Sequence, residues 1–307
     1  MPTVLITGGT GTIGKTLSNM LLQKGYEVIV LSRNPEKQKS KDSHVLFAKW
    51  DIEEGTIDEK AFEKADYIIN LAGAGVADKR WTDERKKEIV YSRTKSGDVL
   101  VKYLRLYPNN VKAMISASAT GFYGEDKSTN KIPFTENDAL ANDFLAKTCQ
   151  HWEQHIKPVE GLGKRLVILR TGIVLSKDGG AFVEFKKPLN FGVATILGNG
   201  KQIISWIHTQ DICNLYIFAM ENEALSGTYN AVAPKPVSNE VLIKSIAKAN
   251  GKFHLSLHAP QFALKLALGE MSTEILKSAT VSASKIEQAG FKFAFPDIDS
   301  AVRDLLS

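Results

Sequence analysis

The chain has 307 residues, of which 43% are hydrophobic and 24% are charged, with a formal net charge of +5. This length suits one large α/β domain with an added lobe, and the mild, dispersed charge argues against a nucleic-acid-binding surface. The sequence shows no membrane-length apolar run, no secretory leader and only two cysteines, Cys149 and Cys213. We therefore expect a soluble, cytoplasmic protein that has no disulfide scaffold and no membrane or nucleic-acid partner.

The first fourteen residues predict a phosphate-binding turn between a buried strand and a helix. Residues 2–7 are apolar and β-branched, and apolar residues after the glycines recur at helical spacing. A Cβ at Gly8 would obstruct the tight turn, one at Gly11 would keep the backbone away from a pyrophosphate, and one at Gly14 would push the helix off the strand. The helix N-terminus would then hold the phosphates. We expect cofactor contacts at Gly8, Gly11, Thr12, Ile13 and Gly14.

The end of the second predicted strand, residues 26–31, indicates which dinucleotide binds. A site that prefers NAD places Asp or Glu here, and this carboxylate would repel a 2′-phosphate. This chain carries Ser32 and Arg33 instead, a hydroxyl donor and a guanidinium fork that suit a phosphate. A surface arginine after a strand is the alternative interpretation. We expect the cofactor to be NADP(H).

Strands and helices then alternate, which predicts a parallel, doubly wound sheet of the α/β class. Strands are expected over 45–50, which closes at Asp51, and over 67–71, which is followed by the small residues 72–75. An Asp at such a strand end commonly reaches the adenine amino group, and small residues let the backbone pass close to the ribose. An amphipathic helix is expected over 82–106, before Pro108.

The second half of the chain is expected to complete the sheet and cover its edge. Strands are predicted over 113–118, 166–170 and 227–231, with a helix over about 143–156. The stretch 119–124 is rich in hydroxyl groups and leaves the carboxyl edge, where open α/β sheets bind ligands. The domains expected are a nucleotide-binding domain over 1–235, with a loop excursion over 172–205 toward the substrate cleft, and a mostly helical lobe over 236–307 on the substrate side.

Further motifs extend over nearly the whole chain. They are Ile6-Thr7-Gly8-Gly9-Thr10-Gly11, Asn70-Leu71-Ala72-Gly73, Arg80-Trp81-Thr82, Ser92-Arg93, Ser118-Ala119-Thr120-Gly121-Phe122-Tyr123-Gly124, Leu169-Arg170-Thr171-Gly172-Ile173-Val174-Leu175 and Ser205-Trp206-Ile207-His208. The tail adds Leu268-Gly269-Glu270 and Ala289-Gly290-Phe291. Together these motifs resemble the atypical, epimerase-like subgroup of the extended short-chain dehydrogenases/reductases, often called epimerase family proteins.

The resemblance implies a Rossmann-type domain that binds NADP(H), a smaller C-terminal lobe over the cleft, a small-molecule substrate and a homodimer. The further cofactor contacts expected are Ser32, Arg33, Asp51, Leu71, Ala72, Gly73, Arg93, Ser116 and Thr171.

The chain departs from this superfamily at the catalytic tyrosine. The superfamily uses a Tyr as acid/base, a Lys four residues later that lowers the pKa of the tyrosine, and a Ser that polarises the substrate oxygen. Lys147 and Ser118 match the last two, but Asp143 stands in the place of the tyrosine, and an aspartate is normally ionised at neutral pH. Tyr123 is the nearest substitute as the acid, with packing in the turn as the alternative. The predicted catalytic residues are Ser118, Tyr123 and Lys147.

The histidines point to no metal site. His151 and His155 share a helix face, but they lack a third ligand nearby. His208 either lies near the substrate or forms a structural pair with Asp211.

Two functions remain open on the sequence. The first is an NADP(H)-dependent oxidoreductase or epimerase-like enzyme with a small, unidentified substrate. The second is a catalytically weak NADP(H)-binding protein that senses redox state or engages a partner. Nucleotide-sugar epimerisation is a narrower option, disfavoured because it needs the acid/base couple that is broken here.

Overall fold

Short runs of apolar, β-branched residues form the central sheet. The computed structural model describes residues 1–38, 44–126 and 132–307. The strands of the main sheet are β1 (Thr3–Thr7), β2 (Glu27–Ser32), β3 (Val45–Asp51), β4 (Thr56–Ile57), β5 (Tyr67–Asn70), β6 (Ala113–Ala119), β7 (Arg165–Thr171) and β12 (Gly227–Ala231). Their order is β12-β7-β6-β5-β1-β2-β3-β4, and only the β3–β4 pair is antiparallel. The predicted doubly wound α/β sheet is confirmed.

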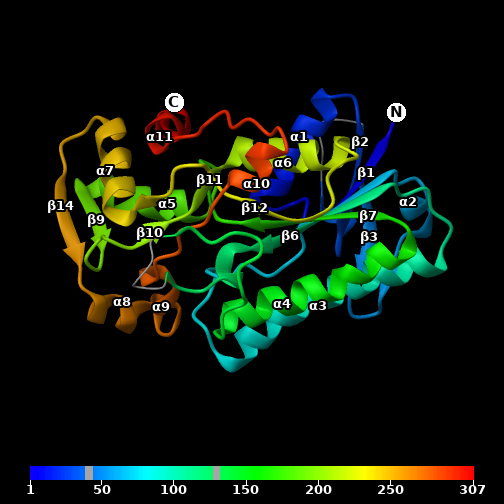
Figure 1. Ribbon diagram of the computed structural model, residues 1–307, viewed down its shortest axis with the longest axis horizontal. Helices are drawn as coiled ribbons and strands as arrows, with labels where there is room; N and C mark the ends of the chain where they lie inside the picture. Colours follow the sequence, from blue (N-terminus) through cyan, green and yellow to red (C-terminus); the bar gives the residue numbers. More distant parts are fainter. Residues whose placement is uncertain (39–43, 127–131) are drawn as a thin grey trace.

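Helices cover both faces of this sheet, as crossovers between parallel strands require. On one face lie α1 (Thr12–Gln23) and α6 (Thr209–Glu221); on the other lie α2 (Glu59–Glu63), α3 (Asp83–Leu106) and α4 (Phe144–Ile156) (Figure 1). Short 3-10 turns follow β2, β6 and α4: η1 (Pro35–Lys37), η2 (Thr120–Phe122) and η3 (Lys157–Leu162). Each helical layer buries its own apolar core, the first around Leu17 and Tyr216 and the second around Phe62 and Leu100.

The two long helices of the second layer begin at polar caps that the sequence contains. The Thr82 hydroxyl accepts a hydrogen bond from the Arg85 amide at 3.1 Å, which starts α3. The Asp143 carboxylate accepts one from the Ala146 amide at 2.9 Å, which starts α4. The helix expected over 143–156 therefore has Asp143 as its cap, at the sheet edge where ligands bind.

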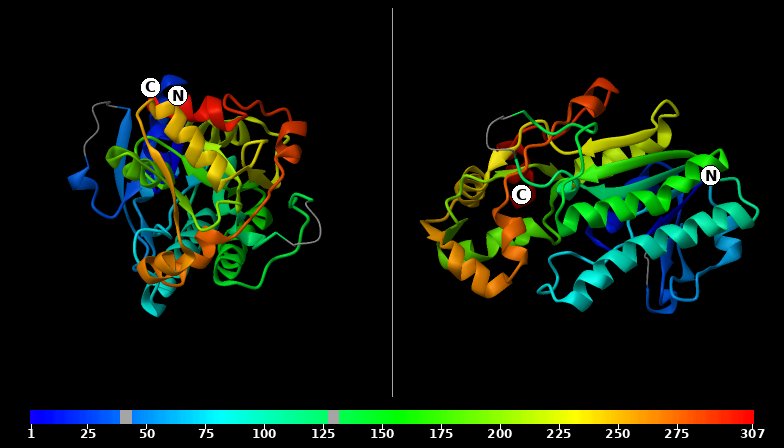
Figure 2. Two further views of the ribbon diagram at one scale, coloured as in Figure 1. Left: turned by 90° about the vertical axis from the view of Figure 1, so that its left-hand side faces the viewer. Right: turned by 60° about the horizontal axis from the view of Figure 1, so that its bottom comes forward.

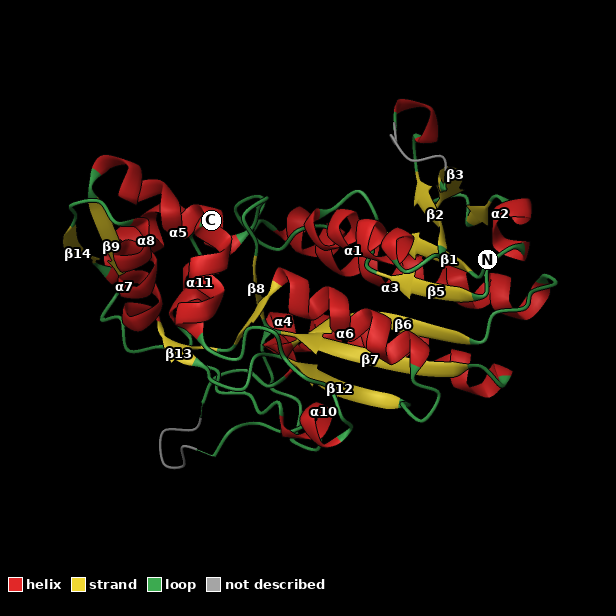
Figure 3. Cartoon of the chain, turned by 90° about the horizontal axis from the view of Figure 1, so that it is seen from above, coloured by secondary structure: helices red, strands yellow, loops and turns green. Residues whose placement is uncertain are grey.

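A second, smaller part lies beyond the carboxyl ends of the main strands (Figures 2 and 3). Its elements are β8 (Ile173–Leu175), α5 (Ala181–Lys186), η4 (Lys187–Phe191), β9 (Val193–Leu197), β10 (Ile203–Ile204), β11 (Trp206–His208), β13 (Val237–Ser238), α7 (Asn239–Asn250), β14 (Leu255–Ala259), α8 (Gln261–Leu268), α9 (Met271–Leu276) and α11 (Ile298–Leu306). The stretch 179–200 thus contains α5 and β9, and it packs with α7 and α11 in one apolar cluster.

The remaining short helix, α10 (Ser284–Gln288), packs against the edge strand β12 of the main sheet. Its Ile286 belongs to the same apolar core as Val4 and Ile6 of β1. The chain therefore returns from the second part to the main sheet near its C-terminus.

Two further contacts join the parts. Apolar side chains of α8 and α9 pack on the starts of α3 and α4, with Met271 against Trp81 and Phe144 in one cluster. The segment 278–283 runs between the first part and β10, where the Ser205 hydroxyl donates to Ala279 O at 2.8 Å and accepts from Val281 N at 2.9 Å. Within the described ranges, none of the helices combines the length and the apolar character needed to cross a bilayer.

Candidate functional site

The glycine turn after β1 leaves an open cradle at the start of α1. Gly8 has φ +67°, and a Cβ there would lie 2.7 Å from Leu71 O. A Cβ at Gly14 would lie 2.5 Å from Gly9 Cα, whereas one at Gly11 would meet only Gly8 O, at 3.3 Å. Gly8 and Gly14 are thus required by backbone packing, and Gly11 faces open space. Neither a side-chain cap nor an acidic residue occupies the first turn of α1. This geometry fits the phosphates of a dinucleotide.

A buried ladder of polar side chains holds the loop after β5 against this cradle. Thr7 Oγ1 donates to Asn70 Oδ1 at 2.7 Å and accepts from the amides of Leu71 and Ala72, both at 3.1 Å. Asn70 Nδ2 in turn donates to Ser116 Oγ at 3.1 Å. The ladder crosses β1, β5 and β6 at their carboxyl ends. It therefore brings Leu71, Ala72 and Ser116, all expected at the cofactor, close to Gly8.

The end of β2 carries no carboxylate and leaves a cation free. Ser32 Oγ accepts a hydrogen bond from the Asn34 amide at 3.2 Å. The Arg33 side chain is exposed, and its guanidinium makes no hydrogen bond to any described residue. At the end of β3, Asp51 Oδ1 accepts from the Glu53 amide at 2.9 Å. The arrangement suits a negatively charged group at the ribose end of a dinucleotide.

Arg93 places a buried positive charge beside Gly73. Arg93 Nη1 donates to Ala74 O at 3.0 Å and to Ile89 O at 2.9 Å, and the guanidinium lies 4.8 Å from the Trp152 ring centre. Burial lowers the pKa of Arg93 to about 10. No carboxylate of the described chain pairs with it, although buried charges are normally paired. A Cβ at Gly73 would come within 3.0 Å of the guanidinium carbon. The site thus fits a ligand that carries negative charge.

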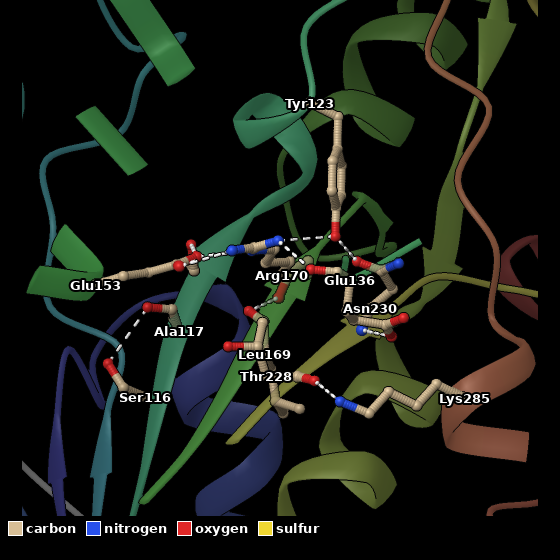
Figure 4. A network of polar contacts seen from close by, with 12 residues as sticks. Ser116, Ala117, Tyr123, Glu136, Glu153, Leu169, Arg170, Thr228, Asn230 and Lys285 are labelled. Carbon is tan, nitrogen blue, oxygen red and sulfur yellow. Dashed lines mark hydrogen bonds and ion pairs between the residues drawn. The ribbon is translucent and has the colours of Figure 1, made fainter. Parts of the chain in front are cut away.

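A buried polar network occupies the exit of β6, where the catalytic residues are expected (Figure 4). Ser118 Oγ donates to Glu153 Oε1 at 2.7 Å. Glu153 forms a two-point ion pair with Arg170, in which Nε and Nη2 each lie 2.8 Å from a carboxylate oxygen. Arg170 Nη1 donates to the Tyr123 hydroxyl at 3.0 Å, and that hydroxyl donates to Asn230 Oδ1 at 2.6 Å. The network spans β6, α4, β7 and β12.

Tyr123 lies inside this network and is only 3% exposed. Burial raises the pKa of Tyr123 to about 12, although Arg170 and Asn230 act in the opposite direction. The hydroxyl proton is already donated to Asn230. The predicted role of Tyr123 as an acid stays a prediction.

Asp143, which the sequence resemblance aligns with the superfamily tyrosine, is bound by a lysine from the second part of the molecule. Lys277 Nζ lies 3.0 Å from Asp143 Oδ2 and 2.6 Å from Glu274 Oε1. Burial acts to lower the pKa of Lys277, but Glu274 and Asp143 outweigh it and raise the pKa above its ordinary value. Burial also raises the pKa of Glu274, against the effect of Lys277. Lys147 is exposed on the first turn of α4, so these two lysines lie at the same helix end.

Sequence reasoning missed four of these residues: Glu153, Arg170, Glu274 and Lys277. Arg170 was part of a quoted motif, and its burial at the end of a strand could have signalled a partner, because buried charges are paired. Glu153, Glu274 and Lys277 carry no local signal, since their partners are distant in sequence. Thr171, expected at the cofactor, donates from Oγ1 to Leu169 O at 3.2 Å.

His208 and His155 make structural contacts. His208 caps α6, where Nδ1 accepts from the Gln210 amide at 3.1 Å, and its Nε2 lies 3.2 Å from Asp304 Oδ2. The structural pair is therefore with Asp304 and not with Asp211, whose carboxylate accepts from the amides of Ala294 and Phe295. His155 Nδ1 lies 2.6 Å from Asp98 Oδ1. Among the described residues, no group of three His, Cys, Asp or Glu side chains is placed to hold a metal.

Comparison with known proteins shows the family of the chain. Residues 4–231 match the NAD dependent epimerase/dehydratase family, and residues 259–305 match a domain of unknown function, DUF1731. An epimerase family protein of Staphylococcus aureus (strain NCTC 8325) is 36% identical over 100% of this chain and 99% of its own.

Two solved structures are also similar. Human epimerase family protein SDR39U1 (isoform 2), solved with NADPH, has a TM-score of 0.86 at 24% identity, over 99% of both chains, and shows the same fold. The nucleoside-diphosphate sugar epimerase from Corynebacterium glutamicum has a TM-score of 0.77 at 32% identity; all of this chain aligns with 58% of that one.

Proposed function

Because this chain belongs to the NAD-dependent epimerase/dehydratase family, we propose that it binds NADP(H) and uses it in an oxidoreductase or epimerase-like reaction on a small molecule. The observation that carries the choice of NADP(H) is Arg33, whose side chain is exposed at the end of β2 beside Ser32 and whose guanidinium makes no hydrogen bond to the described residues. A carboxylate there would repel a 2′-phosphate, and the chain has none. The human relative solved with NADPH supports the same choice.

Different residues of the chain would bind different parts of the cofactor. The cradle at Gly11 and the start of α1 would take the diphosphate, and Arg33 with Ser32 would take the 2′-phosphate. Arg93 would supply the positive charge under the loop at Gly73. Lys147, exposed one turn into α4, would hold the ribose next to the nicotinamide. When bound, the cofactor supplies hydride transfer.

Ser118 is the residue we assign to the substrate oxygen. It lies at the carboxyl end of β6, where open α/β sheets bind ligands. Its side chain is fixed by Glu153 at 2.7 Å. Tyr123 is a weaker candidate, because its proton is committed to Asn230.

A redox sensor without turnover is the second candidate function. It is favoured by one observation: Asp143, in the place of the tyrosine, is bound by Lys277 at 3.0 Å and caps α4. The phenol that the superfamily uses as its acid is absent at this position, so the cofactor site can be complete without the usual acid.

Titration and turnover separate the two functions. Purified protein is titrated with NADPH and with NADH by the quenching of tryptophan fluorescence, then incubated with NADPH and a panel of aldehydes, ketones and quinones. We expect NADPH to bind at least about tenfold more tightly than NADH and to be consumed with at least one carbonyl. Binding without consumption would favour the sensor, and equal affinity for both cofactors would overturn the choice of NADP(H).

A further inference from the structure

The hydrogen bond between Ser118 and Glu153 has a fixed direction. An ionised carboxylate has no proton and can only accept, so the Ser118 hydroxyl must donate its proton to Glu153 Oε1, at 2.7 Å. The free lone pairs of Ser118 Oγ are then left to accept from another group. Ser118 is therefore arranged to take a proton from a substrate hydroxyl while it passes its own proton to Glu153.

Glu153 is held in place as a carboxylate. Arg170 binds both of its oxygens at 2.8 Å, and the guanidinium itself is fixed by the Tyr123 hydroxyl and lies 3.4 Å from the Phe122 ring centre. Two-point pairs of this kind define position as well as charge. The Glu153 side chain keeps 14% of its surface exposed, against 6% for Arg170. The carboxylate is thus held in one position while a small part of the side chain stays accessible.

The charged and titratable groups around Glu153 come from several elements. Arg170 of β7 faces it directly and Cys149 lies on the same helix. Arg93 of α3 acts on Cys149, and Tyr123 and Glu136 contact Arg170. Burial raises the pKa of the Cys149 thiol to about 12, so this group is neutral near pH 7.

We propose that Ser118 and Glu153 form a proton relay that replaces the missing tyrosine, with Glu153 as a positioning residue that acts through Ser118 on a substrate hydroxyl. In the oxidation of an alcohol, the substrate O–H bond breaks and its proton goes to Ser118 Oγ. The Ser118 O–H bond breaks in the same step, and that proton goes to Glu153, which becomes a neutral acid. The carbon–oxygen double bond forms as hydride leaves the carbon, with an oxidised nicotinamide as its acceptor. Reduction of a carbonyl runs the relay backward.

The two alternative proton carriers, Tyr123 and Asp143, already make other polar contacts. The Tyr123 proton is donated to Asn230, and Asp143 is bound by the Ala146 amide and by Lys277. The relay rests on the proposed function, because it needs a cofactor bound over the end of β6. The relay also sets what each reaction direction requires. Oxidation of an alcohol needs Glu153 as the carboxylate that receives a proton, and reduction of a carbonyl needs Glu153 in its protonated form.

The test uses NADPH and 9,10-phenanthrenequinone as the probe, over pH 6 to 9. The wild type should lose rate as pH rises, because reduction requires the relay to deliver a proton to the substrate oxygen. Glu153→Gln and Ser118→Ala should each lower kcat about 10²–10⁴-fold at pH 6 and abolish this slope. The double variant should be no slower than either single one, since both residues act in one relay. Glu153→Asp should restore part of the slope, and all variants should bind NADPH within about twofold of wild type.

A measurement without turnover checks the contact itself. In protein labelled with ¹³C at the glutamate carboxyl carbons, the Glu153 signal is the one that Glu153→Gln removes. Ser118→Ala should shift this signal at constant pH, because the carboxylate loses a charge-assisted hydrogen bond. Ser118→Ala leaves the Arg170 ion pair intact, so it serves as the second variant if Glu153→Gln does not fold. Glu160→Gln, an exposed carboxylate after α4, is the matched control and should behave as wild type.

The outcomes separate the two proposals. A wild type that binds NADPH but reduces no quinone overturns the enzymatic function and the relay with it. A wild type that turns over, with Ser118→Ala and Glu153→Gln variants that keep its rate and pH slope, overturns the relay and leaves the proposed function standing.

Discussion

Asp143 and Lys277 are 134 positions apart in the sequence, yet Lys277 Nζ lies 3.0 Å from Asp143 Oδ2 at the start of α4. The residue in the place of the superfamily tyrosine is therefore bound by the C-terminal domain of unknown function. Glu274, one turn earlier, accepts from the same ammonium at 2.6 Å. The three side chains together fasten α9 to the edge of the cleft.

Removal of this ammonium should destabilise the protein more at neutral pH than at mildly acidic pH. Lys277→Met leaves two half-buried carboxylates facing one another, and we expect a loss of about 1–3 kcal/mol in the free energy of unfolding. The pKa of Glu274 is raised in the folded state, so its protonation stabilises the variant as pH falls toward the ordinary glutamate range. Urea denaturation at pH 5.5 and pH 7.5 measures the difference. A loss that is the same at both values would contradict the contact.

Cofactor choice depends on Arg33. Arg33→Ala removes a charge-assisted contact to the 2′-phosphate, which contributes about 1.5–3 kcal/mol. We expect NADPH affinity to fall about tenfold to a hundredfold while NADH affinity barely changes. Arg105→Ala, an exposed arginine far along α3, is the control. Equal losses for both cofactors would remove Arg33 from the site.

Substitutions at two glycines of the cradle should have different effects, one on cofactor binding and the other on the stability of the fold. A side chain at Gly11 meets only Gly8 O at 3.3 Å, whereas one at Gly14 would meet Gly9 Cα at 2.5 Å. Gly11→Val should abolish cofactor binding at nearly unchanged Tm, because it fills the space of the diphosphate. Gly14→Val should lower Tm itself. Calorimetry and titration of both variants make the comparison, and normal affinity in folded Gly11→Val protein would refute the site.

Tyr123→Phe tests whether this hydroxyl is structural or catalytic. The change leaves Asn230 Oδ1 without a partner and Arg170 Nη1 with only a long contact to Glu136 O, at 3.5 Å, which costs about 1–3 kcal/mol. We expect a lower Tm, unchanged NADPH affinity and turnover within severalfold of wild type. If turnover instead fell 10²–10⁴-fold, the size of a lost general acid, Tyr123 would take the role that we assign to Ser118.

His208 should make the protein sensitive to acid. Burial lowers the pKa of His208 to about 4, although Asp304 acts in the opposite direction. The unfolded chain binds a proton near the ordinary histidine pKa of about 6.5, so folding stability from this group is full above that value and is lost as pH falls toward 4. The loss is about 2–4 kcal/mol. His208→Gln should flatten this part of the stability curve, and an unchanged curve would show that folding does not lower the pKa of His208.

Much of the fold was predictable because it depends on local pattern. The strands of the main sheet appear as short apolar, β-branched runs, and the turn at Gly8 appears in its spacing. The α3 and α4 helices start at the residues the sequence indicates, because Thr82 and Asp143 are ordinary caps. Such features need no knowledge of distant segments.

Contacts between distant segments were not predictable. Tyr123 is bonded to Asn230, 107 positions away, so its burial could not be read from its neighbours. The sequence offers Asp211, three residues on, as the partner of His208. That carboxylate lies within α6 and instead accepts hydrogen bonds from the amides of residues 294 and 295. The partner, Asp304, arrives with the last helix. In each case the tertiary fold decides which polar groups meet.

The return of the chain to the main sheet has a consequence for synthesis on the ribosome. Val281, Ala283, Ile286 and Phe291 lie in the same apolar core as Val4 and Ile6. N-terminal domains usually fold as soon as they emerge, but here the apolar core of the main sheet lacks part of its cover until the segment 281–291 has been made. Nascent chains that lack this segment leave an apolar face open to solvent. The growing polypeptide is thus exposed to aggregation and to chaperone capture until this segment has emerged.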